Sequence, residues 1–492
     1  MPEYKLFAHQ ETAYAKGREM DVFALFCDMG TGKTLIDITD TEARKSFPCL
    51  IVVRGDGALK DNWKLEIKKF TGKDNVGILR GTVTQKRKIL SRLDLYDYVI
   101  TNYESLRSLY LELVSCPFKK ITFDESSQIK NPKAKCTHYA SLLASRIPVR
   151  RILTGTPNPN TPLDLFSQFY CLNPQILKFT ARPGAKKPVS NAFFGFKHKY
   201  AEIEYQYHYG RKHEAVKVDK DTKRPVYKNL DELKRLIEPY CFTIKKKDCL
   251  DLPEELYMTR KVKMAEEQDR IYKELSKEFV AEIPENQFIS VSNCLAKMTR
   301  LQQILGGNVV LDDGAGKRRI AENKTSEVFN ILEEVGDNKA VIWCRFIDEI
   351  VYLREQLTIA GYKVLTYYGD TDDKGAVYNE ILAGNYDVII SNPQSGGMGL
   401  NFTTANYSIY YSRSFSFSEY MQSKDRIYRI GQDKKVTHII LMTEGTLEES
   451  LNAALDVKRE FHELFTNFDK SSLSEFLSGD IKITSKNELT NA

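Results

Sequence analysis

The stretch Val22–Thr34, VFALFCDMGTGKT, decides the fold because a short apolar run leads directly into a glycine-rich turn. The apolar part, Val22–Cys27, is typical of a strand that is buried in a parallel sheet. The residues that follow, Leu35–Arg44, have a helical pattern. A strand, a glycine-rich turn and a helix in this order predict a phosphate-binding loop, since backbone N–H groups and a helix N-terminus both favour an anion.

Each residue of this loop has an expected task. The loop backbone would turn its N–H groups toward phosphate oxygens at Gly30, Thr31 and Gly32. Lys33 would reach the β- and γ-phosphates of ATP, and the Thr34 hydroxyl would bind Mg²⁺. The strict pattern has glycine at position 27, where this chain has Cys27. A glycine-rich turn with a surface lysine is the alternative interpretation.

Similar apolar runs recur along the chain and alternate with helical patterns, which indicates an α/β fold with parallel sheets buried on both faces. The early runs are Val22–Cys27, Leu50–Val53, Tyr98–Thr101, Ile121–Phe123 and Arg151–Thr154. The late runs are Ala340–Cys344, Lys363–Thr366, Val388–Ser391, Ser408–Tyr411 and His438–Met442. We therefore predict an N-terminal lobe at 1–175, a basic, aromatic and helical insert at 176–318, a C-terminal lobe at 319–460 and a polar tail at 461–492.

Two carboxylates, Asp124 and Glu125, directly follow the apolar run Ile121–Phe123. Ligands of open parallel sheets bind at the carboxyl ends of the strands, so these side chains are expected at a binding edge. Asp124 suits Mg²⁺, and Glu125 suits the orientation or deprotonation of an attacking water. An Asp-Glu pair after a strand also serves as a helix N-cap. The phosphate loop upstream favours the catalytic interpretation.

Three further blocks follow in order: LTGTP at 153–157, SGGMGLNF at 395–402 and QSKDRIYRIGQ at 422–432. Together with DMGTGKT at 28–34 and DESS at 124–127, they resemble the Swi/Snf-type DNA translocases of helicase superfamily two. The resemblance covers about 1–460 and is closest to compact phage or prokaryotic versions. It implies two RecA-like lobes that bind ATP and Mg²⁺ between them and act on DNA.

The resemblance also implies roles for individual residues. Gln10 would read the adenine, and Gln422 would face the nucleotide. Arg426 and Arg429 would be arginine fingers, whose guanidinium groups stabilise charge on the transferred phosphoryl group. Because they are three residues apart, they would share one face of a helix. Hydrolysis would be coupled to lobe movement by Thr154, Gly155 and Thr156. Nucleic acid would be contacted by Trp63, Asn102, Tyr103, Ser395, Gly396, Gly397 and Asn401.

Two features depart from the family pattern. The acidic block ends in Ser126-Ser127, where many relatives have a histidine. An Arg-Arg pair that often precedes the second lobe is replaced by Lys245–Lys247, which keeps the charge but loses the bidentate fork. The segment 193–228 is rich in Tyr, Phe, Lys and Arg, and either contacts nucleic acid through stacking and phosphate pairing or is a solvated hairpin.

Composition sets wider limits. The chain has a net charge of +6 and a pI near 8.6, which is compatible with a polyanionic partner but does not require one. Its nine cysteines form no CxxC pair, so a zinc site is not expected and the thiols are typical of a reducing compartment. No apolar run is long enough to span a membrane, and a monomer in the cytoplasm is expected (a host cytoplasm if viral, a nucleus only if eukaryotic).

These observations favour an ATP-dependent translocase on duplex DNA that works in DNA metabolism, with repair or recombination as examples. A strand-separating helicase on DNA or RNA is the alternative, because it would share the ATP-site residues. A non-catalytic clamp on nucleic acid is a third interpretation. The complete set Lys33, Asp124, Glu125, Arg426 and Arg429 opposes it. Partner proteins of replication or recombination are compatible with all three.

Overall fold

The computed structural model describes residues 5–466 except 56–57, 209–210, 222–223, 279, 284–286, 291–293, 312–315 and 394–399. The chain forms two compact units that divide at Leu250. The first unit contains Met1–Leu250 and Lys458–Thr484, and the second unit contains Asp251–Val457 and Ser485–Ala492. The segment 176–318, which the sequence set apart as an insert, is thus shared by the two units.

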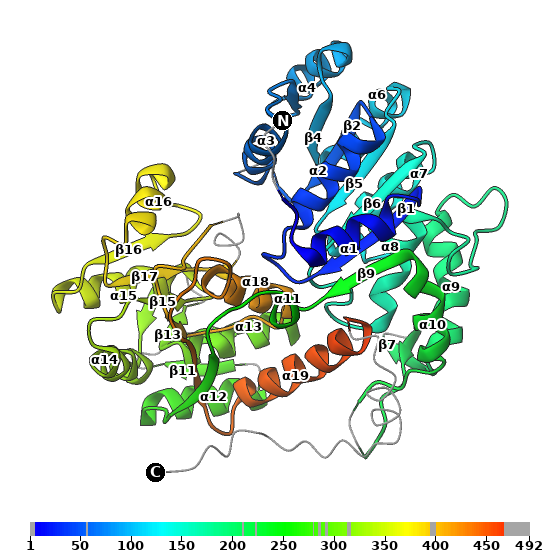
Figure 1. Ribbon diagram of the computed structural model, residues 1–492. Helices are drawn as coiled ribbons and strands as arrows, with labels where there is room; N and C mark the ends of the chain where they lie inside the picture. The colour runs from blue at the N-terminus through cyan, green and yellow to red at the C-terminus, as the bar shows by residue number, and fades with distance from the viewer. Residues whose placement is uncertain are drawn as a thin grey trace. The chain divides into compact units, whose positions relative to one another are not determined.

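The first unit contains a seven-stranded sheet in which all strands run parallel, in the order β3-β4-β2-β5-β6-β1-β9 (Figure 1). The five strands predicted for this lobe are confirmed within two residues at each end. The structure adds β3 and β9 at the two edges of the sheet. The strands are β1 (Val22–Cys27), β2 (Cys49–Val53), β3 (Val76–Ile78), β4 (Tyr98–Asn102), β5 (Lys120–Asp124), β6 (Val149–Leu153) and β9 (Cys241–Ile244).

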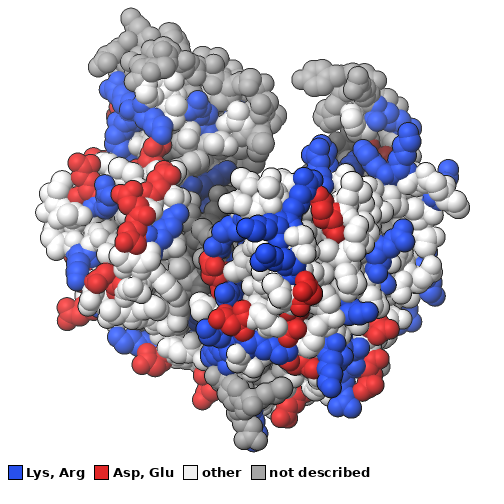
Figure 2. Space-filling model, turned by 90° about the horizontal axis from the view of Figure 1, so that it is seen from above, with Lys and Arg blue, Asp and Glu red and all other residues white. Residues whose placement is uncertain are grey.

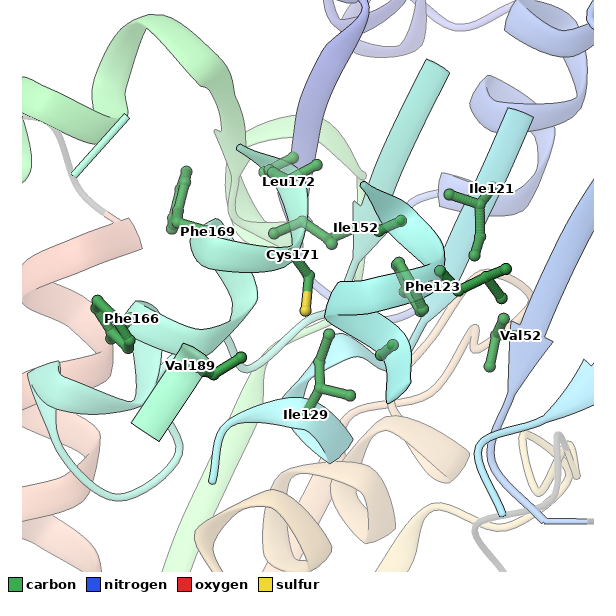
Figure 3. Packing of buried hydrophobic residues seen from close by; sticks show 14 of the residues in the cluster. Val52, Ile121, Phe123, Ile129, Ile152, Phe166, Phe169, Cys171, Leu172 and Val189 are labelled. Atoms are coloured by element: carbon green, nitrogen blue, oxygen red, sulfur yellow. The ribbon is translucent and has the colours of Figure 1, made fainter. Parts of the chain in front are cut away.

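Alternation of side chains along each strand buries both faces of this sheet. Ala24, Val52 and Phe123 belong to the apolar layer of one face, with side chains from helices between Ser105 and Ile237. Figure 3 shows part of this layer, in which Phe166 and Phe169 of α8 gather with strand residues such as Ile152 and Phe123. The next residues along the strands, such as Leu25, Val53 and Leu153, face the opposite layer with α1, α2 and α3.

The helices of the first unit include the predicted helix after the phosphate loop, which begins at Lys33 instead of Leu35. A short antiparallel hairpin, β7 (Ile203–His208) and β8 (Arg211–Val216), follows α9. The helices are α1 (Ala8–Gly17), α2 (Lys33–Arg44), α3 (Ala58–Thr71), α4 (Val83–Leu90), α5 (Ser105–Ser108), α6 (Tyr110–Ser115), α7 (Lys135–Ala144), α8 (Leu165–Leu172), α9 (Pro188–Tyr200), α10 (Leu230–Ile237) and α11 (Lys246–Cys249).

The second unit contains a six-stranded parallel sheet in the order β10-β19-β18-β15-β17-β16. All five strands predicted for the C-terminal lobe are present, and β10 adds an edge. The strands are β10 (Glu255–Val262), β15 (Ala340–Trp343), β16 (Val364–Tyr367), β17 (Val388–Ser391), β18 (Tyr407–Tyr410) and β19 (Val436–Thr443). Two small hairpins are β11 (Val280–Ile283) with β12 (Gln287–Ser290), and β13 (Asn308–Val310) with β14 (Lys317–Arg319).

Helices cover both faces of the second sheet. Side chains of α14 and α15 pack on one face, and side chains of α16 and α18 pack on the other. The helices are α12 (Glu266–Glu278), α13 (Cys294–Leu305), α14 (Asn323–Val335), α15 (Ile347–Ile359), α16 (Lys374–Ala383), α18 (Phe417–Ile427) and α19 (Leu447–Thr466). Two parallel sheets, each flanked by helices, confirm the predicted α/β fold class.

A buried ionic cluster lies at the amino end of β5. The Nζ of Lys120, whose side chain is 0% exposed, pairs with Asp37 at 2.9 Å and Asp40 at 2.8 Å. Asp40 also accepts hydrogen bonds from Arg151 at 3.1 Å and from Arg44 at 2.8 Å. Burial alone would raise the pKa of Asp40, but Lys120 and Arg151 lower it to about 2. Every charge of the cluster therefore has an opposite partner.

Surface charge is mixed, because Lys and Arg occur in several groups with Asp and Glu between them on the face shown in Figure 2. The net charge of +6 is therefore not accompanied by a single uniformly basic face in that view. Within the described residues, no helix combines the length and apolar character that crossing a membrane requires.

Candidate nucleotide site

The phosphate loop lies between the end of β1 and the start of α2. Gly30 and Gly32 both adopt left-handed backbone conformations, with φ of 82° and 86°. A Cβ atom on Gly32 would lie 2.1 Å from Nε2 of Gln10, which would have to move, and the left-handed backbone of Gly32 itself favours glycine. Cys27, which replaces the glycine of the strict pattern, packs into the sheet core, and burial raises the pKa of its thiol to about 12. It therefore acts as a small neutral core residue.

The amine of Lys33 lies across this loop. Its Nζ donates to the main-chain oxygens of Cys27 at 2.7 Å and Asp28 at 3.1 Å. The Thr31 hydroxyl also donates to the Asp28 oxygen, at 2.7 Å. Thr34 stands in the first turn of α2 and is partly exposed. The loop thus presents an ammonium group, a hydroxyl and a helix N-terminus at one place, which is the arrangement that favours a phosphate.

Gln10 lies against the same loop from α1. Its Nε2 donates to the Thr31 oxygen at 3.1 Å, and its Oε1 accepts from the Phe7 N–H at 3.0 Å. His9 Nε2 also lies 2.9 Å from the Thr31 oxygen. The structure therefore brings Gln10 to the nucleotide loop, with both groups of its amide already bonded within the protein.

The acidic pair stands at the carboxyl end of β5. The Asp124 carboxylate accepts from the Glu125 N–H at 3.0 Å and from the Trp63 indole at 2.8 Å. Burial and the neighbouring charge of Glu125 raise the pKa of Asp124 to about 6, against opposing effects of Trp63 and Lys33. Glu125 has a left-handed backbone with φ of 50°, a conformation that costs energy in a residue other than glycine and is enriched at functional sites.

The segment Thr154–Thr156 follows β6 and contacts both neighbouring segments. The Thr154 hydroxyl donates to Glu125 Oε2 at 3.2 Å and accepts from the Thr156 N–H at 3.1 Å. A Cβ atom on Gly155 would lie 3.1 Å from Met29 Cγ, so glycine allows this segment to approach the phosphate loop closely. The loop, the acidic pair and the predicted coupling segment are therefore adjacent in the first unit.

Trp63, Asn102 and Tyr103, which the sequence predicts to contact nucleic acid, are buried in the structure. Their side chains are 1%, 6% and 3% exposed. Trp63 bonds to Asp124, Tyr103 donates to the Asp124 main-chain oxygen at 2.8 Å, and Asn102 bonds to Glu104 at 2.8 Å. These three residues are buried because their side chains point into the protein core, while other side chains of the same segments face the solvent. In this conformation Trp63 and Tyr103 hold Asp124 of the acidic pair, whereas Asn102 bonds to its neighbour Glu104.

In the second unit, Gln422 and Arg426 lie on α18 and are each 4% exposed. Arg429 lies beyond the end of α18, so the two arginines do not share a helix face as the spacing suggested. They nevertheless converge, because both guanidinium groups donate to the Leu400 oxygen, at 3.5 and 3.4 Å. Gln422 Nε2 donates to the Ser418 hydroxyl at 3.4 Å.

The predicted contact block 395–402 is only partly described. Ser395, Gly396 and Gly397 lie outside the described residues. Asn401 accepts a hydrogen bond from the Thr403 N–H at 3.1 Å, which forms a local turn next to the arginines. Gln432, which the sequence gave no separate role, ties this segment together by donating to the Ala405 oxygen at 2.8 Å and the Ile427 oxygen at 3.2 Å.

The basic and aromatic segment 193–228 contains the end of α9 and the β7–β8 hairpin. Part of its charge is neutralised internally, since Lys197 pairs with Glu214 at 3.5 Å and Lys199 pairs with Glu232. The ammonium group of Lys212 lies 3.7 Å from the ring centre of Tyr205, which is half exposed. Lys212 and Tyr205 therefore place a cation beside an exposed aromatic ring in this segment.

Comparison with known proteins gives the family. Residues 18–308 match the SNF2-related domain, and residues 323–431 match the helicase conserved C-terminal domain. The chain belongs to the SNF2-related family. The two matched domains and the two parallel sheets confirm the predicted pair of RecA-like lobes of a Swi/Snf-type helicase core.

Relatives at the sequence level are distant. An uncharacterized ATP-dependent helicase of Mycoplasma genitalium is 25% identical over 446 residues, which cover 88% of this chain and 39% of that protein. The Zorya protein ZorD of Escherichia coli is 27% identical over 489 residues, covering 88% of this chain and 41% of that protein. This SNF2-related chain therefore spans about two fifths of the length of these relatives.

Among solved structures, the SWI2/SNF2 ATPase core of Sulfolobus solfataricus in complex with dsDNA is similar to this chain at 24% identity. The match covers 97% of this chain and 96% of the other, with a TM-score of 0.42.

Proposed function

We propose that this SNF2-related chain hydrolyses ATP and uses the energy to move along duplex DNA. The observation that carries the proposal is the cluster of Lys33, Asp124, Glu125 and Thr154 around one loop at the carboxyl edge of the first sheet. The match to a helicase C-terminal domain supports movement on nucleic acid. The relatives named as ATP-dependent helicases support the use of ATP.

The donor set of the site fits Mg²⁺. Hard divalent cations prefer oxygen ligands, and the site offers the Thr34 hydroxyl and the Asp124 carboxylate. Burial and Glu125 raise the pKa of Asp124, and a cation bound beside this carboxylate would lower that pKa again. Mg²⁺ would neutralise charge on the β- and γ-phosphates when it is bound with ATP.

The side chains of the chain itself would perform the remaining steps. The loop and Lys33 would bind the phosphates, with Lys33 exchanging a main-chain oxygen for a phosphate oxygen. Glu125, held by Thr154, would orient the attacking water and accept its proton. Arg426 and Arg429 would stabilise charge on the transferred group as arginine fingers. The bond between Glu125 and Thr154 would link the state of the nucleotide to the segment after β6.

The first test is steady-state ATP hydrolysis without nucleic acid, and with duplex DNA, single-stranded DNA or RNA. The variant Glu125→Gln removes the proposed base, and Glu19→Gln is a matched control at an exposed glutamate outside the site. We expect duplex DNA to stimulate hydrolysis in the wild type and the control, and Glu125→Gln to lose about 10²-fold or more of the rate. Absence of hydrolysis in the wild type under every condition would overturn the proposal.

Movement and strand separation need separate assays. Displacement of a third strand from a triplex reports translocation on duplex DNA, and release of a labelled strand from a fork reports unwinding. We expect triplex displacement that depends on ATP and is lost in Glu125→Gln. Stimulation by single strands or RNA alone, together with strand release, would instead favour a strand-separating helicase.

A further inference from the structure

Trp63 connects the helix–sheet core of the first unit to the acidic pair. It lies on the inward face of α3, where its ring packs in the same apolar layer as Ile67, Val53 and Ile100. The side chain is only 1% exposed, yet its Nε1–H donates to Oδ2 of Asp124 at 2.8 Å. An indole has one polar atom, and here that atom is directed at the carboxylate proposed to serve the cation.

Other groups around Asp124 hold its carboxylate and its main chain in place. Oδ1 accepts from the Glu125 N–H at 3.0 Å, so each carboxylate oxygen has one donor. The Tyr103 hydroxyl donates to the Asp124 main-chain oxygen at 2.8 Å, and the Tyr103 ring stacks on Phe123 with centroids 6.2 Å apart. Backbone and carboxylate of Asp124 are thus held from two different segments, the end of β4 and helix α3.

We propose that Trp63 is a positioning residue, which orients the Asp124 carboxylate for the divalent cation bound with ATP. The inference rests on the proposed ATP hydrolysis. A carboxylate with free rotation about its terminal bond must be ordered when a cation binds, whereas one held by a donor at each oxygen is already ordered. Each oxygen keeps a further lone pair after accepting one hydrogen bond, so the contact leaves room for the cation or its water.

The expected effect of losing the hydrogen bond from Trp63 follows from comparable contacts in metal sites. Loss of a hydrogen bond to a metal-binding side chain typically lowers metal affinity or activity about 10- to 100-fold. Trp63→Phe removes the indole N–H and keeps an aromatic ring in the core. We therefore expect Trp63→Phe to reduce the gain in ATP affinity that Mg²⁺ provides, and to change the affinity for ATP without Mg²⁺ much less.

The chain provides a matched control, because it contains only two tryptophans. Trp343 on β15 of the second unit is 0% exposed, and its Nε1 donates to the Ser408 hydroxyl at 3.0 Å. Trp343→Phe therefore removes an equally buried indole and one hydrogen bond to a neutral group. A general loss of core packing would affect both variants, while loss of positioning would affect only Trp63→Phe.

The test is the affinity for ATP by calorimetry, in Mg²⁺ and in EDTA, for the full-length wild type and both variants. For Trp63→Phe we expect an affinity within about 2-fold of wild type in EDTA, and a loss of about 10-fold or more in Mg²⁺. Trp343→Phe should match the wild type in both buffers. An equal gain from Mg²⁺ in all three proteins would overturn the inference.

A second measurement on the wild-type sequence covers the case in which Trp63→Phe does not fold. The chain labelled with 5-fluorotryptophan has one ¹⁹F signal from each tryptophan, which Trp343→Phe assigns by removing one of them. We expect the Trp63 signal to shift with ATP and Mg²⁺ but much less with ATP in EDTA, and the Trp343 signal to stay. A Trp63 signal that Mg²⁺ does not affect would contradict the inference. If the wild type binds ATP equally with and without Mg²⁺ and hydrolyses none, the proposed function itself fails.

Discussion

The two ends of strand β5 hold buried charge in opposite ways. At the amino end, Lys120 is fully buried and pairs with Asp37 and Asp40 at 2.9 and 2.8 Å. At the carboxyl end, the adjacent carboxylates Asp124 and Glu125 have hydrogen-bond donors but no ion pair among the described residues. Consequently the pKa of Asp40 is lowered to about 2, while burial and Glu125 raise the pKa of Asp124 to about 6.

This difference in charge pairing indicates that one end of β5 serves stability and the other end serves function. A buried charge is tolerated when an opposite charge compensates for its lost hydration, as at the amino end. Carboxylates without such a partner reduce stability until a ligand supplies the charge, which is a common property of active sites. The paired end therefore belongs to the framework, and the unpaired end belongs to the site.

The largest expected effect comes from breaking the paired end. Lys120→Met leaves two buried carboxylates with fewer cations, so we expect a loss of about 3–5 kcal/mol in the free energy of unfolding of the first unit. Calorimetric unfolding measures it. Lys73→Met is the control, since Lys73 pairs with Glu42 at 2.8 Å at a more accessible site, and should cost no more than about 1 kcal/mol. Similar losses of unfolding free energy in Lys120→Met and Lys73→Met would contradict the special role of the buried cluster.

Acid should also reduce the stability that the ionic cluster at the amino end of β5 provides. Because the pKa of Asp40 lies near 2, below its ordinary value of 3.8, its charged form stabilises the fold above about pH 4. That contribution is lost as the pH falls through about 2. We expect Asp40→Asn to cost roughly 2 kcal/mol at pH 7 and much less near pH 2, by the difference between the two pKa values. Urea midpoints measured from pH 2 to 7 test this, and a cost that does not depend on pH would refute it.

The unpaired end should show the opposite pH dependence, with a smaller effect. The pKa of Asp124 is raised to about 6, so the folded state binds a proton more readily than the unfolded state. Stability should therefore fall as the pH rises from about 4 to 6. Asp124→Asn lacks this loss, and we expect its stability relative to wild type to improve by about 1–2 kcal/mol between pH 4 and pH 7. The measurement uses the same urea midpoints in EDTA without nucleotide, and a relative loss at pH 7 would contradict it.

The central strands and the backbone conformation of the phosphate loop were predictable from the sequence. The direction in which individual side chains point was not. Strands β1 and β17 have the predicted bounds because each is a continuous apolar run buried in a parallel sheet. The edge strands β3 and β10 escaped prediction because one is short and the other is largely exposed. The left-handed conformations of Gly30 and Gly32 fit the phosphate-loop motif.

Trp63 shows why part of the site required the structure. Its segment indicated contact with nucleic acid, but the face of α3 that is buried depends on the sheet on which it packs. The partner of its indole, Asp124, lies 61 residues away in the sequence. Arg429 is similar, since helical spacing placed it beside Arg426 and the helix ends before it at Ile427. Both arginines meet at the Leu400 oxygen through a turn that local periodicity does not encode.

The edge strands also have a consequence for biosynthesis. The first sheet is completed by β9, whose Cys241 lies beside Ala24 of β1, and the second by pairing of β10 with β19, which ends at Thr443. On the ribosome, the first sheet can close as soon as β9 has left the exit tunnel, while β10 must wait for almost the whole second unit to be made. The nascent chain should therefore acquire a protease-resistant first sheet well before the second, and synthesis pauses after β10 should prolong exposure of an unpaired strand edge.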